Sequence, residues 1–124
     1  MSDASSPANV VQRQFAAYNA KDLDAWLATY APDARQFEHP DKLLASGHAE
    51  IRPRGTTRFA DPLLHARLIQ RTVYGNLVVD HEELTLTLPK GPGRMELVCL
   101  YIVANGLIQT ASFIFGTLVP DLKG

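Results

Sequence analysis

Glu38 and His39 stand side by side in the stretch "RQFEHPDK", and both side chains could transfer protons. A histidine has an unperturbed pKa of about 6.5, so it can take or give a proton near neutral pH. A carboxylate can serve as a general base when its surroundings raise its pKa. The pair precedes Pro40, where a short predicted strand ends. We therefore take Glu38 and His39 as candidate catalytic residues; the alternative is a solvated strand end.

The strand predicted over 34–39 favours His39 as the inward member of the pair. Side chains alternate between the two faces of a strand. Phe37 is the apolar residue of the stretch, so it is expected to point into the protein. His39 would share the face of Phe37, whereas Gln36 and Glu38 would point outward.

A second cluster of titratable side chains lies in "VVDHEEL", on another predicted strand. By the same alternation, Asp80 and Glu82 face one way, whereas His81 and Glu83 face the other. Adjacent strand residues point apart, so Asp80 and Glu82 cannot orient His81. We predict that His81 reaches a binding pocket beside Val79; the alternative is an outer-face histidine that is hydrogen-bonded or wet.

The histidine and cysteine content predicts neither a metal nor another cofactor. The four histidines have no ligand-pair spacing, and no cysteine pair supports them. Cys99 is the lone cysteine, in the apolar run "LVCLYIV", and is expected to be a small buried apolar residue. Arg67 and Arg71 are interpreted as a charged stripe facing solvent or a second copy, with an anionic ligand as the alternative.

Aromatic residues of the N-terminal third could bind a ring by area and stacking. They would also form the core between helices and sheet, and both roles are expected together. We predict one cavity bordered by Tyr18, Trp26, Phe37, His39 and Tyr101.

The elements that position these residues follow from hydrophobic periodicity. Apolar residues recur at helical spacing from Pro7 onward, and a second helix is predicted after Asp22, which can cap it. That second helix carries Tyr30 and ends before Pro32. His48 to Phe59 is predicted to be a kinked or broken helix, or a turn in which Pro53 opens a new segment.

The second half of the chain is predicted to be a long antiparallel meander. Its strands span 64–74, 77–88, 94–104 and 107–118, with turns at Gly75-Asn76 and Asn105-Gly106. Asn-Gly between two β runs is a strong hairpin signal. Three helices, an early strand and this meander predict an α+β fold.

Three stretches in this order resemble the nuclear transport factor 2-like superfamily, most closely its ketosteroid isomerase and polyketide cyclase branch: "VVQRQFAAYNAKDLDAWLATYAPDA", "SGHAEIR" and "NGLIQTASFIFG". The resemblance implies a curved antiparallel sheet wrapped on three helices as a cone. It implies a deep, mostly apolar pocket for a small apolar molecule. It also implies a homodimer formed through the outer face of the sheet.

The resemblance also assigns roles, residue by residue. The family's catalytic base falls at Glu38 or His39. Its oxyanion tyrosine falls at Gln14, which can still donate a hydrogen bond. Its protonated acid falls near Leu100, which cannot. The expected substrate-binding residues are therefore Gln14, Tyr18, Trp26, Phe37, His81 and Tyr101.

Composition sets the remaining expectations. With 124 residues the chain is expected to form a single domain, 1–124, with residues 1–6 disordered. The net charge of −1 and the lack of a basic block predict no nucleic-acid or membrane partner. The lone cysteine and the absence of a signal-peptide pattern or a long apolar run predict a cytoplasmic protein.

The last two predicted strands are apolar on both faces, which predicts a homodimer. Leu97 and Cys99 alternate with Val98 and Leu100, and a one-sided sheet would alternate apolar with polar. Three helices can cover only the concave face. A two-fold dimer through the outer face would cover the rest. The predicted function is proton-transfer catalysis on a small apolar carbonyl compound; the alternative is a non-catalytic binding module.

Overall fold

The computed structural model describes residues 3–121, which form three helices and a seven-stranded sheet. The elements in chain order are α1 (Pro7–Ala20), α2 (Leu23–Leu27), β1 (Tyr30–Glu38), β2 (Lys42–Ser46), α3 (His48–Phe59), β3 (His65–Tyr74), β4 (Leu77–Leu88), β5 (Gly91–Ala104), β6 (Leu107–Phe115) and β7 (Val119–Pro120).

The sheet has the strand order β2-β1-β6-β5-β4-β3, with β7 paired to β5. Strands β3 to β6 form the antiparallel meander that the sequence predicts. β1, however, runs parallel to β6, so the sheet is mixed and the prediction of an all-antiparallel sheet is wrong on this point. The chain can make this parallel pair because α3 and four strands lie between β1 and β6.

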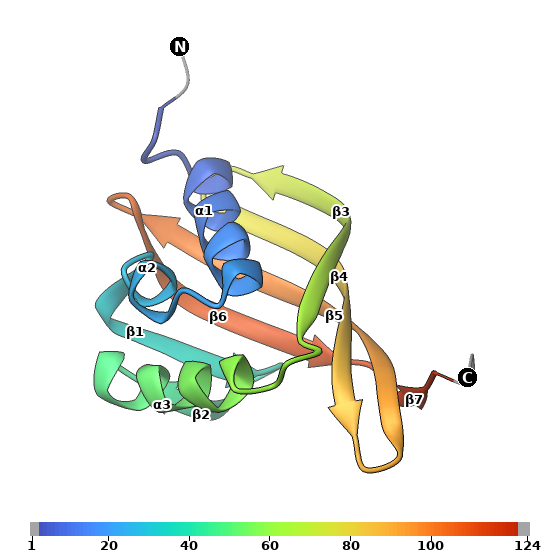
Figure 1. The fold of residues 1–124 in the computed structure, drawn as a ribbon. Coiled ribbons are helices and arrows are strands. Elements are labelled where there is room, and N and C mark those ends of the chain that lie inside the picture. The colour runs from blue at the N-terminus through green and yellow to red at the C-terminus, as the bar shows by residue number, and fades with distance from the viewer. Residues whose placement is uncertain (1–2, 122–124) are drawn as a thin grey trace.

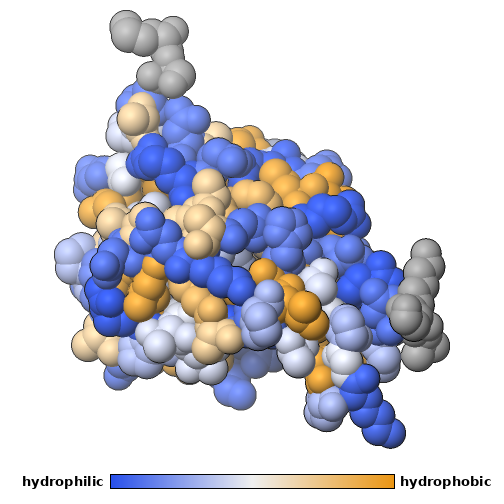
Figure 2. All heavy atoms as spheres, viewed as in Figure 1, coloured by the Kyte–Doolittle hydropathy of each residue, from blue (hydrophilic) through white to orange (hydrophobic). Residues whose placement is uncertain are grey.

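The helices lie on the concave face of the curved, unclosed sheet, as expected (Figure 1). α1 crosses over the central strands, and α2 and α3 lie over the β1 side. The surface of this side of the molecule is mostly hydrophilic, with smaller hydrophobic patches between the polar side chains (Figure 2). The buried apolar residues of the helices and of the sheet form one core between these two layers. Cys99 belongs to this core and is buried as predicted.

The second helix is shorter than predicted. Its cap is confirmed, because the Asp22 carboxylate accepts a hydrogen bond from the Ala25 amide at 3.1 Å. The helix ends at Leu27, where the Thr29 amide and hydroxyl both donate to the Trp26 carbonyl. Tyr30 therefore begins β1 instead of continuing the helix, and this carries its ring into the core at the start of the strand.

α3 is one continuous helical segment in spite of Pro53, so the predicted break and the alternative turn are both wrong. Proline removes a backbone donor from a helix interior, which local propensity disfavours. The helix is held instead by packing: Ile51 and Gly55 are buried, against α2 and the β1–β2 edge. Tertiary contacts therefore override the poor helical sequence.

Both predicted hairpin turns are present. Asn105 and Gly106 have φ values of 56° and 74°, which is the pair of positive φ angles that a tight two-residue hairpin requires. β5 begins earlier than predicted, at Gly91, and β6 ends earlier, at Phe115.

The expectation of disorder over residues 1–6 falls partly on residues 1 and 2, which lie outside the described residues. Ser6 caps α1, since its hydroxyl accepts a hydrogen bond from the Asn9 amide. No helix within residues 3–121 has the length and apolar character that crossing a membrane requires.

Candidate functional site

A cavity lies between the helices and the concave face of the sheet. Its empty space is about 610 Å³, counting the part that is open to solvent. Every helix and four strands contribute to its wall. The lining residues are Gln14, Phe15, Tyr18, Trp26, Tyr30, Gln36, Arg54, Gly55, Arg58, Glu82, Leu84, Leu97, Cys99, Tyr101, Phe113 and Phe115.

Packed aromatic rings build one side of this cavity. The indole ring of Trp26 contacts the rings of Tyr30 and Phe59, with centroids 5.2 and 5.5 Å away. Tyr18 packs edge-on against Phe59 at 5.3 Å. Gly55 allows this arrangement, because a Cβ atom there would lie 2.6 Å from Cζ3 of Trp26. Because Gly55 has no side chain, the indole ring of Trp26 can pack directly against α3 at this position.

Glu82 is the carboxylic acid of the cavity wall. Its side chain is on the inward face of β4, and the residue is only 5% exposed. Burial first, and then the negative charge of Asp80 and a hydrogen bond with it, raise its pKa to about 8, although Arg71 and Cys99 act in the opposite direction. The carboxyl is therefore mostly protonated at neutral pH and can donate a hydrogen bond.

Asp80, two residues away on the same face, is in a different electrostatic state. It is fully buried, and its two oxygens accept hydrogen bonds from Nε and Nη2 of Arg71 at 2.7 and 2.9 Å. Arg71 also donates to the Gln12 side chain on α1. A two-pronged arginine–carboxyl bond of this kind is among the strong hydrogen-bonded contacts in proteins. The interpretation of Arg71 as part of a solvent- or partner-facing stripe is therefore wrong, because its guanidinium reaches a buried partner.

Two polar atoms of the cavity wall have no hydrogen-bond partner among residues 3–121. They are Oε1 of Gln14 and Nε1 of Trp26, and both residues are at least nine-tenths buried. Leaving a buried donor or acceptor unpaired costs roughly 1–3 kcal/mol, so such atoms are rare in folded proteins. A ligand with a donor and an acceptor would satisfy both atoms.

The phenols and the thiol of the cavity stay neutral at physiological pH. Burial raises the pKa of Tyr18 to about 12, and it raises the pKa values of Tyr30, Tyr101 and Cys99 as well. These groups therefore act as hydrogen-bonding partners or apolar wall, and not as bases near pH 7.

The structure brings together four of the predicted substrate-binding residues. Gln14, Tyr18, Trp26 and Tyr101 all line the cavity. They lie on α1, α2 and β5, where the spacing of apolar residues in the sequence indicates the face that points inward.

Phe37 and His39 are not among the lining residues, so the predicted inward face of β1 is wrong. Gln36 is the inward residue; it is 2% exposed and accepts a hydrogen bond from Nε of Arg54 at 2.8 Å. Phe37 is only partly buried, and the Arg35 guanidinium lies over its ring at 5.4 Å. The side-chain amide of Gln36 can be buried because Arg54 of α3 donates a hydrogen bond to it. The sequence of β1 alone does not reveal this partner.

Glu38 and His39 lie at the end of β1, outside the set of cavity residues. The Glu38 carboxylate is 3.9 Å from Nζ of Lys42, and His39 is exposed. The backbone amide of His39 donates to the carbonyl of Phe113. Their catalytic role stays a prediction.

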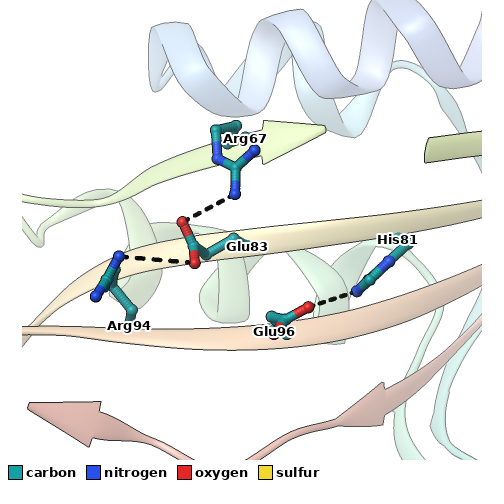
Figure 3. Close-up of polar contacts among 5 residues, drawn as sticks. All are labelled: Arg67, His81, Glu83, Arg94 and Glu96. Atoms are coloured by element: carbon teal, nitrogen blue, oxygen red, sulfur yellow. Dashed lines mark hydrogen bonds and ion pairs between the residues drawn. The ribbon is translucent and has the colours of Figure 1, made fainter. Parts of the chain in front are cut away.

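The prediction that His81 reaches the pocket is also wrong. Its Nε2 lies 2.7 Å from the Glu96 carboxylate on the outer face of the sheet (Figure 3). Glu83 shares this face, where it lies between Arg67 at 3.4 Å and Arg94 at 3.9 Å. The inward residues of β4 have even numbers, so Glu82 is the residue that sequence reasoning missed.

A signal for Glu82 is present in the same strand. In "ELTLTL", Leu84 and Leu86 alternate with threonines, and both leucines are buried in the structure. Extending that alternation back by one step places Glu82 on the buried face.

Solved structures with the same fold share low sequence identity with this chain. A cystatin-fold protein from Novosphingobium aromaticivorans is 22% identical with a TM-score of 0.78, over 88% of this chain and 97% of that one. A protein of ketosteroid isomerase-like fold from Catenulispora acidiphila, in complex with trimethylamine, is 14% identical with a TM-score of 0.75, over 86% and 85%. The epoxide hydrolase/cyclase-like enzyme SalBIII, of pyran ring formation in salinomycin, is 15% identical with a TM-score of 0.82, over 91% and 94%.

These identities show a shared fold and nothing finer. No curated protein matches the chain. A family model described as the SnoaL-like domain matches residues 11–110, which includes most of α1, all of α2 and α3, and most of the sheet. The match covers well over half of the chain, and the expected nuclear transport factor 2-like architecture is the one observed. This chain belongs to the SnoaL-like domain family.

Proposed function

We propose that this chain is a proton-transfer enzyme, a cyclase or isomerase, that acts on a small and largely apolar carbonyl compound in the cavity. Glu82 is the acid–base group in this proposal. The observation that carries it is a buried cavity carboxyl with a pKa of about 8. A general acid or base works best when its pKa lies near the working pH. Membership of the SnoaL-like family supports cyclase or isomerase chemistry.

The chemistry follows from the protonation state of Glu82. The ionised fraction of Glu82 accepts a proton from the carbon next to the carbonyl, which gives an enolate. The neutral carboxyl that forms in this step then donates the proton back, to the enolate oxygen or to another carbon of the enolate. The aromatic wall, with Tyr18 and Trp26, holds the apolar body of the substrate.

The test is hydrogen–deuterium exchange at the carbon next to the carbonyl of 2-tetralone, followed by proton NMR. We expect the protein to accelerate exchange, and Glu82→Gln to lower that acceleration on the order of 10²-fold or more. The matched control is Glu83→Gln, which changes the adjacent carboxylate on the outer face. Equal acceleration by the wild type and the Glu82 variant would contradict the proposal.

Glu38 and His39 are tested in the same assay. Glu38→Gln and His39→Gln are expected to leave the rate unchanged if Glu82 is the acid–base group. A loss in either of them, with full activity of the Glu82 variant, would move the role to the end of β1.

A non-catalytic binding module is the second candidate. One observation favours it: Glu82 is the single carboxyl among the cavity residues, so no second acid or base is paired with it there. This candidate predicts that 2-tetralone quenches or shifts the fluorescence of Trp26, the sole tryptophan, without any accelerated exchange.

A further inference from the structure

Two arginines line the cavity from the same helix face. Arg54 and Arg58 lie one helical turn apart on α3, and both belong to the cavity wall. Arg54 uses Nε to bind the neutral amide oxygen of Gln36. Neither guanidinium has a carboxylate partner within residues 3–121, where the arginines that pair with an acid are Arg52, Arg67, Arg71 and Arg94.

The two positive charges are close to each other and not balanced inside the cavity. The pKa of Arg54 is lowered, first by burial and then by the charge of Arg58. Glu82, the cavity carboxyl, is mostly neutral at pH 7 and supplies little negative charge. Two like charges held together in a partly buried site favour an anion between them.

The arginines stand where the cavity meets the surface. A neighbouring surface cleft shares both of them, and its other residues are Pro53, Thr57, Asp61, Leu86 and Thr87. Asp61 is the acid of this cleft, but its oxygens accept hydrogen bonds from Thr87 and from the amide of Leu63. Lys21 lies beside Asp61, and its charge helps to lower the pKa of that carboxyl. The Asp61 carboxylate thus has other partners, and no ion pair within residues 3–121 joins it to Arg54 or Arg58.

Deeper in the wall are the two unpartnered atoms, Oε1 of Gln14 and Nε1 of Trp26. The indole nitrogen can only donate and the amide oxygen can only accept. A hydroxyl satisfies both in turn, and a carbonyl satisfies the donor. The wall between them and the arginines is mainly aromatic and aliphatic.

We propose that the cavity selects a small carboxylic acid that also carries a carbonyl or hydroxyl group. The carboxylate binds between Arg54 and Arg58 at the mouth, and the second oxygen reaches toward Trp26 and Gln14. This inference rests on the proposed function in that it takes the cavity as the substrate site. Beyond that function, it specifies that the substrate carries a negative charge and a carbonyl or hydroxyl group.

The test compares a matched pair of probes, 3-benzoylpropionate and its neutral carboxamide, 4-oxo-4-phenylbutanamide. Both have an aromatic ring and a ketone, and only the first carries a negative charge. Affinity is measured from the fluorescence of Trp26 and by calorimetry at low and high salt. We expect the acid to bind about tenfold or more tightly than the amide, with a preference that salt weakens.

The variants separate the two arginines from the rest of α3. Arg58→Gln and the double variant Arg54→Gln/Arg58→Gln are expected to lose the preference for the acid, and Arg54→Lys is expected to keep most of it. The matched control is Arg52→Gln, on the same helix but paired with Asp24 outside the cavity. Circular dichroism of each variant verifies that α3 is intact, and Arg58→Gln alone suffices if the double variant does not fold.

The outcomes distinguish this inference from the proposed function. Preferred binding of the acid without accelerated exchange supports the anion site and contradicts the enzyme. Equal affinity for the two probes, or no binding of either at millimolar concentration, overturns the anion site, whatever the exchange assay gives. A preference that survives Arg58→Gln and the folded double variant also overturns it.

Discussion

Asp80 and Glu82 lie two residues apart on the inward face of β4, yet only Asp80 is bound by an arginine. Arg71 gives Asp80 two hydrogen bonds, so its negative charge is compensated. Glu82 is buried next to that charge without a cation of its own among the described residues, and its pKa rises to about 8. One strand thus holds a structural carboxylate and a protonated carboxyl side by side, and each leads to a separate prediction.

The stability of the protein should depend on pH through Glu82. Its pKa is about 8 in the folded protein, against an ordinary value of 4.5 for glutamate, so between these values the folded state holds one more proton. Stability is therefore expected to fall as pH rises from about 4.5 to 8, by up to about 1.4 kcal/mol per pH unit. Chemical unfolding at several pH values checks this. Glu82→Gln should flatten the profile and Glu83→Gln should not; parallel profiles for all three proteins would refute the assignment.

Removing the cation from Asp80 should cost far more than removing an exposed one. Arg71→Met leaves a fully buried carboxylate uncompensated, with an expected loss of roughly 3–5 kcal/mol in the free energy of unfolding. The control Arg67→Met, on the same strand, breaks an exposed pair with Glu83 and should cost below about 1 kcal/mol. Urea unfolding measures both. Similar losses in the two variants would show that Arg71 has no special role.

Gly55 should resist substitution although alanine is the better helix former. Gly55→Ala would place a Cβ atom 2.6 Å from the Trp26 ring, so the indole must move. The expected loss is about 1–3 kcal/mol, larger than the gain in helix propensity, together with a shifted Trp26 emission. Thr56→Ala, at the neighbouring exposed position, serves as control. A stabilised Gly55 variant with unchanged emission would contradict the close contact.

Gln14 should contribute little to the stability of the empty protein. Its buried Oε1 has no partner within residues 3–121, so Gln14→Met removes an unsatisfied polar atom and keeps most of the volume. The variant is expected to be as stable as the wild type or more so, but to bind hydroxyl- or carbonyl-bearing probes less well. Thermal unfolding without and with the probe separates the two effects. A strongly destabilised variant would mean that Gln14 is a structural residue.

The homodimer remains a prediction, and a substitution on the outer face of the sheet can test it. Ile114 is exposed there on β6, paired with Val98 of β5. Light scattering at micromolar concentration is expected to give twice the 13.6 kDa chain mass. Ile114→Glu should reduce it to one chain mass, because a charge in the centre of an apolar interface is costly. Leu43→Glu, exposed on the edge strand β2, should not. A monomeric wild type would rule out this interface.

Local sequence determined most of the fold. Asp22 caps the second helix as predicted, and Asn105-Gly106 forms the predicted hairpin, because both depend on residues within a few positions of each other. The apolar alternation of "ELTLTL" also fixed the inward face of β4, and with it the burial of Glu82. These features need no knowledge of distant segments.

Tertiary structure alone decided the chemistry of the site. Gln36 turned inward because Arg54 reaches it from α3, and Asp80 is buried with a partner because Arg71 reaches it from β3. The pKa of Glu82 depends on its burial and on the charges of Asp80 and Arg71. Charges and hydrogen bonds act through space over a few ångströms, between residues on different helices and strands. The protonation state of a carboxyl therefore follows from the assembled fold, and not from its place in the chain.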